Sequence, residues 1–264
     1  MQQFFTDFRL GISGFKQAHK FLAKHKLLWV FVFPILLNIL LLFGGFELMK
    51  NALDAVETAF MAKVTGSEFW SSSWVFTAFS VLINIVFRLV FMLLFAYLGG
   101  YIVLILMSPL MAWLSEKVAE KYTGKVTEFN ALQFISDIWR GIVISVRNMF
   151  IEIVLTLLAL FGAFVPLLGL ASPVVLFLIS AYFYGFSFMD YTNERRKLNI
   201  NKSITEISTH KGMAIAAGSI FSIFLLLPFI GVLVSSFIAI YSVTGTTIAM
   251  CNPNYQPAFD VERI

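Results

Sequence analysis

The sequence predicts an all-α integral membrane protein, with two long transmembrane helices and two helical hairpins that penetrate the membrane only partly. Of its 264 residues, 59% are hydrophobic and only 13% are charged, whereas about 25% charged residues are usual in soluble domains. The mean hydropathy of +0.86 agrees with this composition. The basic residues, which give a net charge of +4, flank long apolar stretches, as is typical of membrane topology signals. The sequence therefore predicts a single membrane domain over residues 1–264.

Residues 1–26 are expected to form an amphipathic helix that lies in the membrane interface. Apolar or aromatic side chains recur at spacings of three and four: Phe4, Phe8, Ile12, Phe15, His19 and Leu22. Polar and basic side chains occupy other faces: Arg9, Ser13, Lys16 and Lys20. This pattern is typical of an interfacial helix, although Gly11 and Gly14 weaken it. The segment ends in a basic run: Lys24, His25 and Lys26.

Two apolar stretches are long enough to cross the membrane as helices, residues 27–48 and residues 74–110. At about 1.5 Å per residue, the second would reach about 55 Å, well beyond a hydrocarbon core of about 30 Å. Arg88 therefore lies deep in the bilayer, where it would need a partner, or at the outer surface if the span is residues 89–110. A polar helix continues beyond the second stretch, and Thr123 followed by glycine is a plausible stop.

Two later stretches, residues 147–190 and residues 212–250, are expected to form helical hairpins that turn inside the membrane. Each arm of the first spans roughly 20–25 Å, short of the hydrocarbon core of about 30 Å. A turn in water would carry Asn, Asp or Lys, but these turns are apolar. Both contain a Pro-x-x-Gly pattern, which favours a structural repeat. The turn residues are Pro166 and Gly169 in the first hairpin, and Pro228 and Gly231 in the second.

The distribution of basic residues predicts the topology. Residues 1–26, 111–150 and 190–212 hold five Lys or Arg each, whereas residues 49–73 hold two. The positive-inside rule then places the N-terminus in the cytoplasm, requires only two complete crossings, and starts and ends both hairpins on the cytoplasmic side. Complete crossings with buried or very tight outer turns remain open. We expect the polar tail, residues 251–264, to be mobile.

The sequence offers no residue set typical of a catalytic or metal site. Its three histidines and one cysteine are isolated, and it has no phosphate-binding loop or nucleophile motif. We therefore expect no enzyme, cofactor, metal or nucleic-acid partner. It does offer ionisable residues near the inner membrane face, which could fix helices structurally or line an ion pathway. The candidates are Glu116, Arg140, Arg147, Glu152, Asp190 and Arg195.

Four stretches carry a family resemblance: residues 33–40 (FPILLNIL) after the N-terminal helix, residues 108–124, residues 166–169 (PLLG) and residues 180–197. In this order and spacing they resemble the CysZ family of bacterial inner-membrane sulfate permeases, whose superfamily includes the etoposide-induced membrane proteins. The resemblance implies two long tilted transmembrane helices and two partly penetrating hairpins, assembled as a homo-oligomer in the lipid bilayer of the bacterial inner membrane. It also implies uptake of sulfate, or a similar small anion, for cysteine biosynthesis.

The chain departs from the family before the first span. The family typically has a Gly-hydrophobic-Arg-Arg segment there that contributes to sulfate binding, whereas residues 26–29 read Lys-Leu-Leu-Trp. Lys24, His25 and Lys26 would then attract the anion at the cytoplasmic mouth, with less geometric specificity than arginine. A buried network that organises the hairpins would consist of Arg140, Arg147, Glu152 and Asp190.

A different function fits the same charges. The protein would be a non-transporting membrane scaffold or assembly protein, whose charged cluster docks a partner on the cytoplasmic face. Co-purification of a stable partner, indifferent to sulfate, would favour this alternative.

Overall fold

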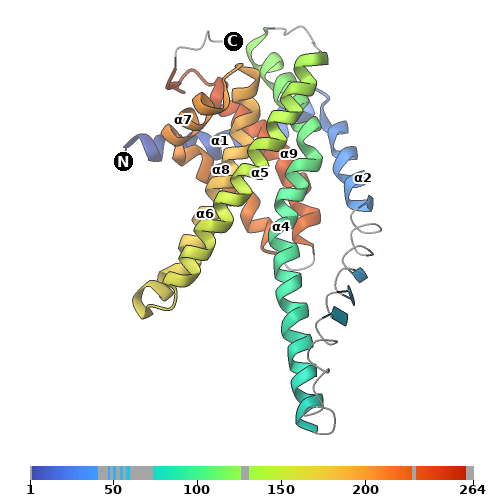
Figure 1. Cartoon of the computed structure of the whole chain (residues 1–264). Coiled ribbons are helices and arrows are strands. Elements are labelled where there is room, and N and C mark those ends of the chain that lie inside the picture. The colour runs from blue at the N-terminus through green and yellow to red at the C-terminus, as the bar shows by residue number, and fades with distance from the viewer. Residues whose placement is uncertain are drawn as a thin grey trace. The chain divides into compact units, whose positions relative to one another are not determined.

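The computed structural model describes residues 2–40, 74–125, 131–227 and 230–259, with short helical pieces of one or two residues between 47 and 59. Regular structure in these ranges is helical throughout, which confirms the predicted all-α class (Figure 1). The helices are α1 (Gln2–Lys24), η1 (Leu28–Phe31), α2 (Val32–Leu40), α4 (Trp74–Thr123), α5 (Ala131–Gly162), α6 (Pro166–Arg195), α7 (Ile200–Thr209), α8 (Lys211–Leu225) and α9 (Gly231–Cys251).

Three helices are long and apolar enough to cross a membrane, within the part of the chain that the structure describes. These spans are Trp139–Gly162, Gly169–Arg195 and Leu233–Cys251. A fourth would be added if the bent pair formed by α1 and Leu28–Leu40 counted as one span. The protein is thus a membrane protein with several apolar helices, while two long helices plus two partly penetrating hairpins stays a prediction.

The chain forms two compact units, Ile35–Gly99 and a larger one made of Met1–Pro34 with Gly100–Ile264. In the smaller unit, the first part of α4 exposes apolar side chains such as Leu82 and Ile85, as a lipid-facing helix would. The alternatives for Arg88 concern a side chain outside the described part of the structure. The helix α4 ends at Thr123, where the sequence predicts a stop.

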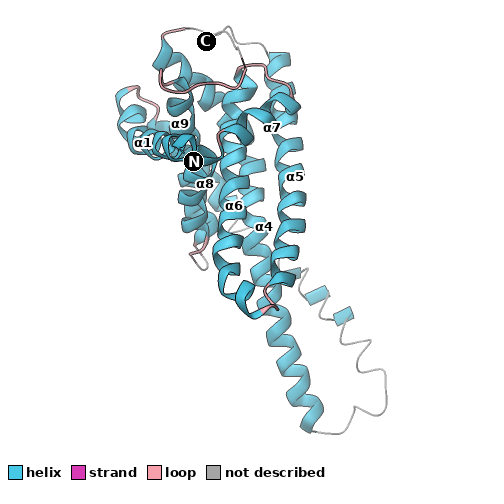
Figure 2. Ribbon diagram, turned by 90° about the vertical axis from the view of Figure 1, so that its left-hand side faces the viewer, coloured by secondary structure: helices cyan, strands magenta, loops and turns pink. Residues whose placement is uncertain are grey.

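The centre of the larger unit is built from helices whose backbones touch. Figures 1 and 2 show α6, α8 and α9 side by side, with α1 lying across α8 and α9. A Cβ atom added to Gly185 would overlap the carbonyl of Ala214, and one added to Gly218 would overlap the carbonyl of Ala181. Such close approach is how small residues join helices in membranes, where lipid removes the hydrophobic drive for association.

The first helix packs on α8 and α9 through a face that the sequence analysis did not select. Its buried residues are Asp7, Gly11, Gly14, Ala18 and Leu22, so of the expected apolar stripe only Leu22 is fully buried. The two glycines interpreted as weak points are contact points: a Cβ on Gly14 would overlap the carbonyl of Gly245. After α1, the chain bends by 108° into Leu28–Leu40.

The first hairpin has longer arms than the sequence analysis expected. The helices α5 and α6 contain 32 and 30 residues, because both continue as helix through the charged residues at their outer ends. Their apolar spans of 24 and 27 residues would reach about 36–40 Å. Gly169 lies in the first turn of α6, since that helix begins at Pro166.

The second hairpin is shorter. The helix α8 has 15 residues, about 22 Å, and α9 has 21 residues beginning at Gly231. Pro228 lies outside the described residues.

Candidate functional site

Three polar contacts join α5 to α6 along the inside of the first hairpin. The pairs are Arg140 with Asp190, Asn148 with Ser187, and Glu152 with Ser180, and these six residues are termed the polar ladder. Their spacings of eight and four residues place the α5 members on one face of that helix. Elsewhere the hairpin exposes large apolar side chains, including Phe161, Phe164 and Leu170. The hairpin therefore has an apolar outside and a polar inside.

The outermost pair of the ladder is a buried ion pair. Arg140 Nη2 donates to Asp190 Oδ1 at 2.8 Å, and Arg140 Nη1 donates to the carbonyl of Leu198 at 2.5 Å. Asp190 is only 2% exposed and also accepts a hydrogen bond from Ser203. A buried carboxylate needs such charge-assisted bonds to offset the loss of water. The structure thus brings together two predicted residues, Arg140 and Asp190, and connects them to α7 through Ser203.

The inner pairs lie within the two apolar spans. Glu152 is fully buried and accepts a hydrogen bond from Ser180. Asn148 Nδ2 donates to Ser187 Oγ at 3.5 Å, and Arg147 Nη1 donates to Asn148 Oδ1 at 3.1 Å. Arg147, which the sequence analysis grouped with Glu152, therefore joins the ladder through the neighbouring amide.

The remaining two predicted network residues meet where α4, α6 and α9 end. Arg195 interacts electrostatically with Glu116 and Glu120 of α4 and with Cys251 of α9. None of these residues belongs to the polar ladder. Their contacts link the end of α6 to the last turns of α4. A contact of this kind belongs with the first of the two predicted roles, charges that fix helices to one another.

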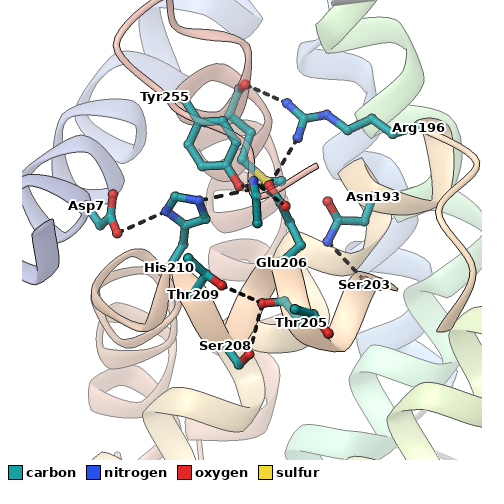
Figure 3. A network of polar contacts seen from close by, with 12 residues as sticks. Asp7, Asn193, Arg196, Ser203, Thr205, Glu206, Ser208, Thr209, His210 and Tyr255 are labelled. Atoms are coloured by element: carbon teal, nitrogen blue, oxygen red, sulfur yellow. Dashed lines mark hydrogen bonds and ion pairs between the residues drawn. The ribbon is translucent and has the colours of Figure 1, made fainter. Parts of the chain in front are cut away.

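A second buried polar group surrounds Glu206 of α7, and the sequence analysis missed it. The Glu206 cluster consists of Asp7, Arg196, Glu206, His210 and Tyr255 (Figure 3). The Tyr255 hydroxyl donates to Glu206 Oε1 at 2.5 Å, and the amide of Ala258 donates to Glu206 Oε2 at 2.8 Å. Arg196 Nη1 lies 3.7 Å from Oε1. This carboxylate therefore holds the C-terminal segment against α7.

His210 connects the same cluster to the first helix. Its Nδ1 lies 3.0 Å from Asp7 Oδ2, and its Nε2 lies 4.0 Å from Glu206 Oε1. Against the expectation of a mobile tail, Tyr255 is 3% exposed. Burial and the adjacent Glu206 raise the pKa of Tyr255 well above its ordinary value, so its hydroxyl stays protonated and donates.

Sequence reasoning could not assemble the Glu206 cluster because its members come from both ends of the chain and from α6 and α7. Isolated acids and a single histidine carry no spacing signal when their partners lie about two hundred residues away, as Asp7 and His210 do. The one local hint was the four-residue spacing of Glu206 and His210, which places them on one face of a helix.

The predicted anion-attracting run lies at the end of α1. Lys24 and Lys26 are exposed, whereas His25 is half-buried beside the Phe21 ring at 4.4 Å. Burial, together with the nearby Lys24 and Lys121, lowers the pKa of His25. The imidazole is therefore uncharged at neutral pH, and the lysines carry the positive charge. Lys121 of α4 also acts on His25, and it was not among the residues predicted from the sequence.

Comparison with protein families decides the relationship of the chain. Residues 14–235 match the family described as sulfate transporter CysZ/etoposide-induced protein 2.4. The chain belongs to this family. The resemblance inferred from the sequence is thereby confirmed over more than half of the chain. No curated protein matches at a significant level.

The position of the polar ladder bears most directly on the function of this CysZ/etoposide-induced family protein. Ionisable residues within membrane-spanning helices are costly and often mark pathways for ions. Arg147 and Glu152 lie within the span Trp139–Gly162. The Glu206 cluster instead lies among α1, α7, the residue that follows α6 and the tail, outside the three spans. The ladder is therefore the better candidate for a pathway and the cluster for a structural lock.

Proposed function

We propose that this protein is a permease for sulfate, or for a similar small oxyanion, in the bacterial inner membrane. The observation that carries the proposal is the polar ladder, a set of buried polar pairs inside a hairpin with an apolar exterior. Membership of a family whose description includes a sulfate transporter supports the substrate class. The proposal includes a cytoplasmic N-terminus, a homo-oligomeric assembly, a contribution to cysteine biosynthesis, and no enzymatic step.

Arg147 is proposed to bind the anion within the hairpin. Its guanidinium is half-buried and donates to a neutral amide oxygen, Asn148 Oδ1. An arginine has a fixed fork of donors that suits two oxygens of an oxyanion. The adjacent contact between Asn148 and Ser187 is long, at 3.5 Å, so these groups exchange it for an anion at little cost. Arg147 and Asn148 thus supply neighbouring donors, whereas the Ser187 hydroxyl already donates to the carbonyl of Phe183.

The other predicted residues have supporting roles in this proposal. Lys24 and Lys26, with Lys121 beside them, attract the anion at the cytoplasmic mouth, and His25 shapes that site without adding charge at neutral pH. The remaining residues hold the hairpin and its neighbours in position: Glu116, Arg140, Glu152, Asp190 and Arg195. Carboxylates repel an oxyanion, so a positioning role fits Glu152 and Asp190, which accept hydrogen bonds from Ser180 and Ser203.

Sulfate uptake by the purified protein in proteoliposomes tests this proposal. Arg147→Ala should lower the initial uptake rate about tenfold or more, since a hydrogen bond to a charged group contributes roughly 1.5–3 kcal/mol. Lys197→Ala is the matched control because it too removes one positive charge, but from an exposed position beyond the end of the hairpin, and it should transport at the wild-type rate. Both variants should elute as the wild type does in size-exclusion chromatography. Wild-type uptake no greater than that of empty vesicles would refute the permease.

The scaffold alternative has less support from the placement of the charges. A docking surface needs exposed charged groups, whereas Asp190 and Glu194 are 2% and 3% exposed. A stable partner that co-purifies regardless of sulfate, combined with absence of uptake, would favour the scaffold.

A further inference from the structure

The helix α1 has a basic face directly opposite the face that packs on the protein. Its exposed residues at spacings of three and four are Arg9, Ser13, Lys16, Lys20 and Lys24. Arg9, Lys16 and Lys20 are termed the basic face, and Lys24 is set apart because it belongs to the proposed anion entrance. The only acidic residue of α1 is Asp7, which is buried against His210. The positive charge of the basic face therefore has no carboxylate on its own helix to offset it.

An aromatic edge runs beside the basic face. Phe4 and Phe5 are 37% and 60% exposed, and the rings of Phe4 and Phe8 stack with centroids 6.3 Å apart. Ile12 and Phe15 continue this edge and are half-buried. A helix with basic residues on one side and aromatic residues next to them is typical of helices that lie in a membrane interface.

The position of α1 on the hairpin α8–α9 agrees with an interfacial location. It contacts α8 in its first turns, where Gly212 and Ala216 meet Phe4 and Gly11, and α9 near its end, where Gly245 meets Phe15. Both contacts lie at the end of the hairpin opposite its turn. Since the chain also bends by 108° between α1 and the apolar segment Leu28–Leu40, α1 runs nearly at right angles to that segment.

We propose that the basic face of α1 binds the headgroups of acidic phospholipids. The basic face and the acidic headgroups carry opposite charges. Each lysine or arginine close to an acidic leaflet strengthens binding by about fivefold. The aromatic edge favours a lipid surface over an acidic protein, because it supplies the apolar half of an interfacial helix. This inference needs only that the protein is inserted in a membrane, so it stands whether or not the protein transports an anion.

Lipid binding by the full-length protein in detergent tests the inference. Phosphatidylglycerol and phosphatidylcholine are titrated separately, and bound lipid is counted by native mass spectrometry. The test variant combines Arg9→Gln, Lys16→Gln and Lys20→Gln. The matched control combines Lys197→Gln, Lys202→Gln and Lys211→Gln, which remove the same charge from exposed positions on other elements. The wild type should prefer phosphatidylglycerol, the test variant should lose this preference by about tenfold to hundredfold, and the control should change less than about twofold.

Four results would overturn the inference. Equal losses in both triple variants would mean that net charge alone attracts the lipid, and an unchanged preference in the test variant would mean that α1 has no part in it. Displacement of phosphatidylglycerol by inorganic phosphate, but not by chloride at equal ionic strength, would identify a free-oxyanion site. The inference would also be overturned if an acidic protein bound to the wild type were lost from the test variant while phosphatidylglycerol stayed bound. Size-exclusion chromatography of each variant ensures that the comparison is between folded proteins.

Discussion

The hairpins α5–α6 and α8–α9 have the same backbone hydrogen bond at their turn glycines. The amide of Gly169 donates to the carbonyl of Val165 at 2.8 Å, and the amide of Gly231 donates to the carbonyl of Leu227 at 2.8 Å. In both cases the acceptor lies four residues before the glycine. The repeated Pro-x-x-Gly pattern therefore corresponds to a repeated geometry at its glycine positions.

The two glycines also lie against carbonyl groups at equivalent positions in their turns. A Cβ atom on Gly169 would lie 2.6 Å from the carbonyl oxygen of Ala163, and one on Gly231 would overlap the carbonyl of Leu225. Each of these carbonyls lies six residues before its glycine. Both turns thus fold the chain so tightly that only glycine fits without a backbone shift.

The arms that follow from these similar turns are packed in different ways. In the first hairpin, 22% of the apolar span of α5 and 28% of that of α6 are buried, against 78% for α9 in the second. Helices α8 and α9 meet their neighbours, α6 included, through Gly212, Gly218 and Gly245, whereas α5 meets α6 through the polar ladder. Small residues bring backbones into contact, while polar pairs join helices whose bulky side chains face lipid. A similar turn can therefore support a core hairpin or a lipid-facing one.

The largest expected effect comes from adding bulk to the close helix contact of the core. Gly218→Leu would push a side chain into the carbonyl of Ala181, and overpacking against a backbone costs about 3 kcal/mol. We expect loss of the monodisperse peak in size-exclusion chromatography. Gly162→Leu is the matched control, because nothing lies within 4 Å of a Cβ added at the end of α5. If both variants were equally unstable, the contrast between a core hairpin and a lipid-facing hairpin would be wrong.

Substitution of the two turn glycines should lower the stability by similar amounts, although the arms that the turns join are packed differently. Gly169→Ala and Gly231→Ala each place a methyl group against a carbonyl six residues earlier, which costs about 1–3 kcal/mol. Thermal unfolding in detergent should show similar decreases in Tm for the two variants. A decrease in only one of them would mean that the turns share a sequence pattern without sharing its physical constraint.

The helical class could be predicted because it depends on local patterns. Apolar runs, Pro-x-x-Gly turns and flanking charges are each read within about 20 residues. The stop of α4 at Thr123 was predicted in the same way. The lengths of α5 and α6 were underestimated because charged residues were taken as the ends of the arms, although helix formation tolerates them.

Contacts between distant residues could be predicted only in part. Arg140 and Asp190 were grouped by charge and proximity to the hairpin, and the structure pairs them at 2.8 Å. Gly14 was read as a weakness because its partner, Gly245, comes from a helix more than two hundred residues away. The Glu206 cluster was missed for the same reason, since Glu206 accepts its hydrogen bond from Tyr255 in the tail. Packing partners decide the meaning of such residues, and a single sequence does not reveal them.

The smallest expected effect concerns the strength of a ladder contact relative to a contact of the core. A double-mutant cycle of Glu152→Ala and Ser180→Ala should give a coupling energy of about 1 kcal/mol or more, because the acceptor is a buried carboxylate. The cycle of Ser115→Ala and Thr247→Val measures a neutral hydroxyl contact of α9, with oxygen atoms 3.1 Å apart. Its coupling should be about 0.6 kcal/mol, the average for such contacts in membrane proteins. Both energies come from thermal unfolding of the single and double variants in the same detergent.

The order of these two coupling energies separates two explanations of the first hairpin. If the polar ladder holds α5 to α6, its charged contact must exceed the neutral contact of α9, because α9 is also held by buried small residues. Coupling near zero between Glu152 and Ser180 would mean that the hairpin arms are joined by their apolar surfaces alone. Glu152→Gln refines the result, since it keeps an acceptor for Ser180 while removing the charge. Retention of most of the coupling in that variant would assign the contact to hydrogen bonding, and its loss would assign it to charge.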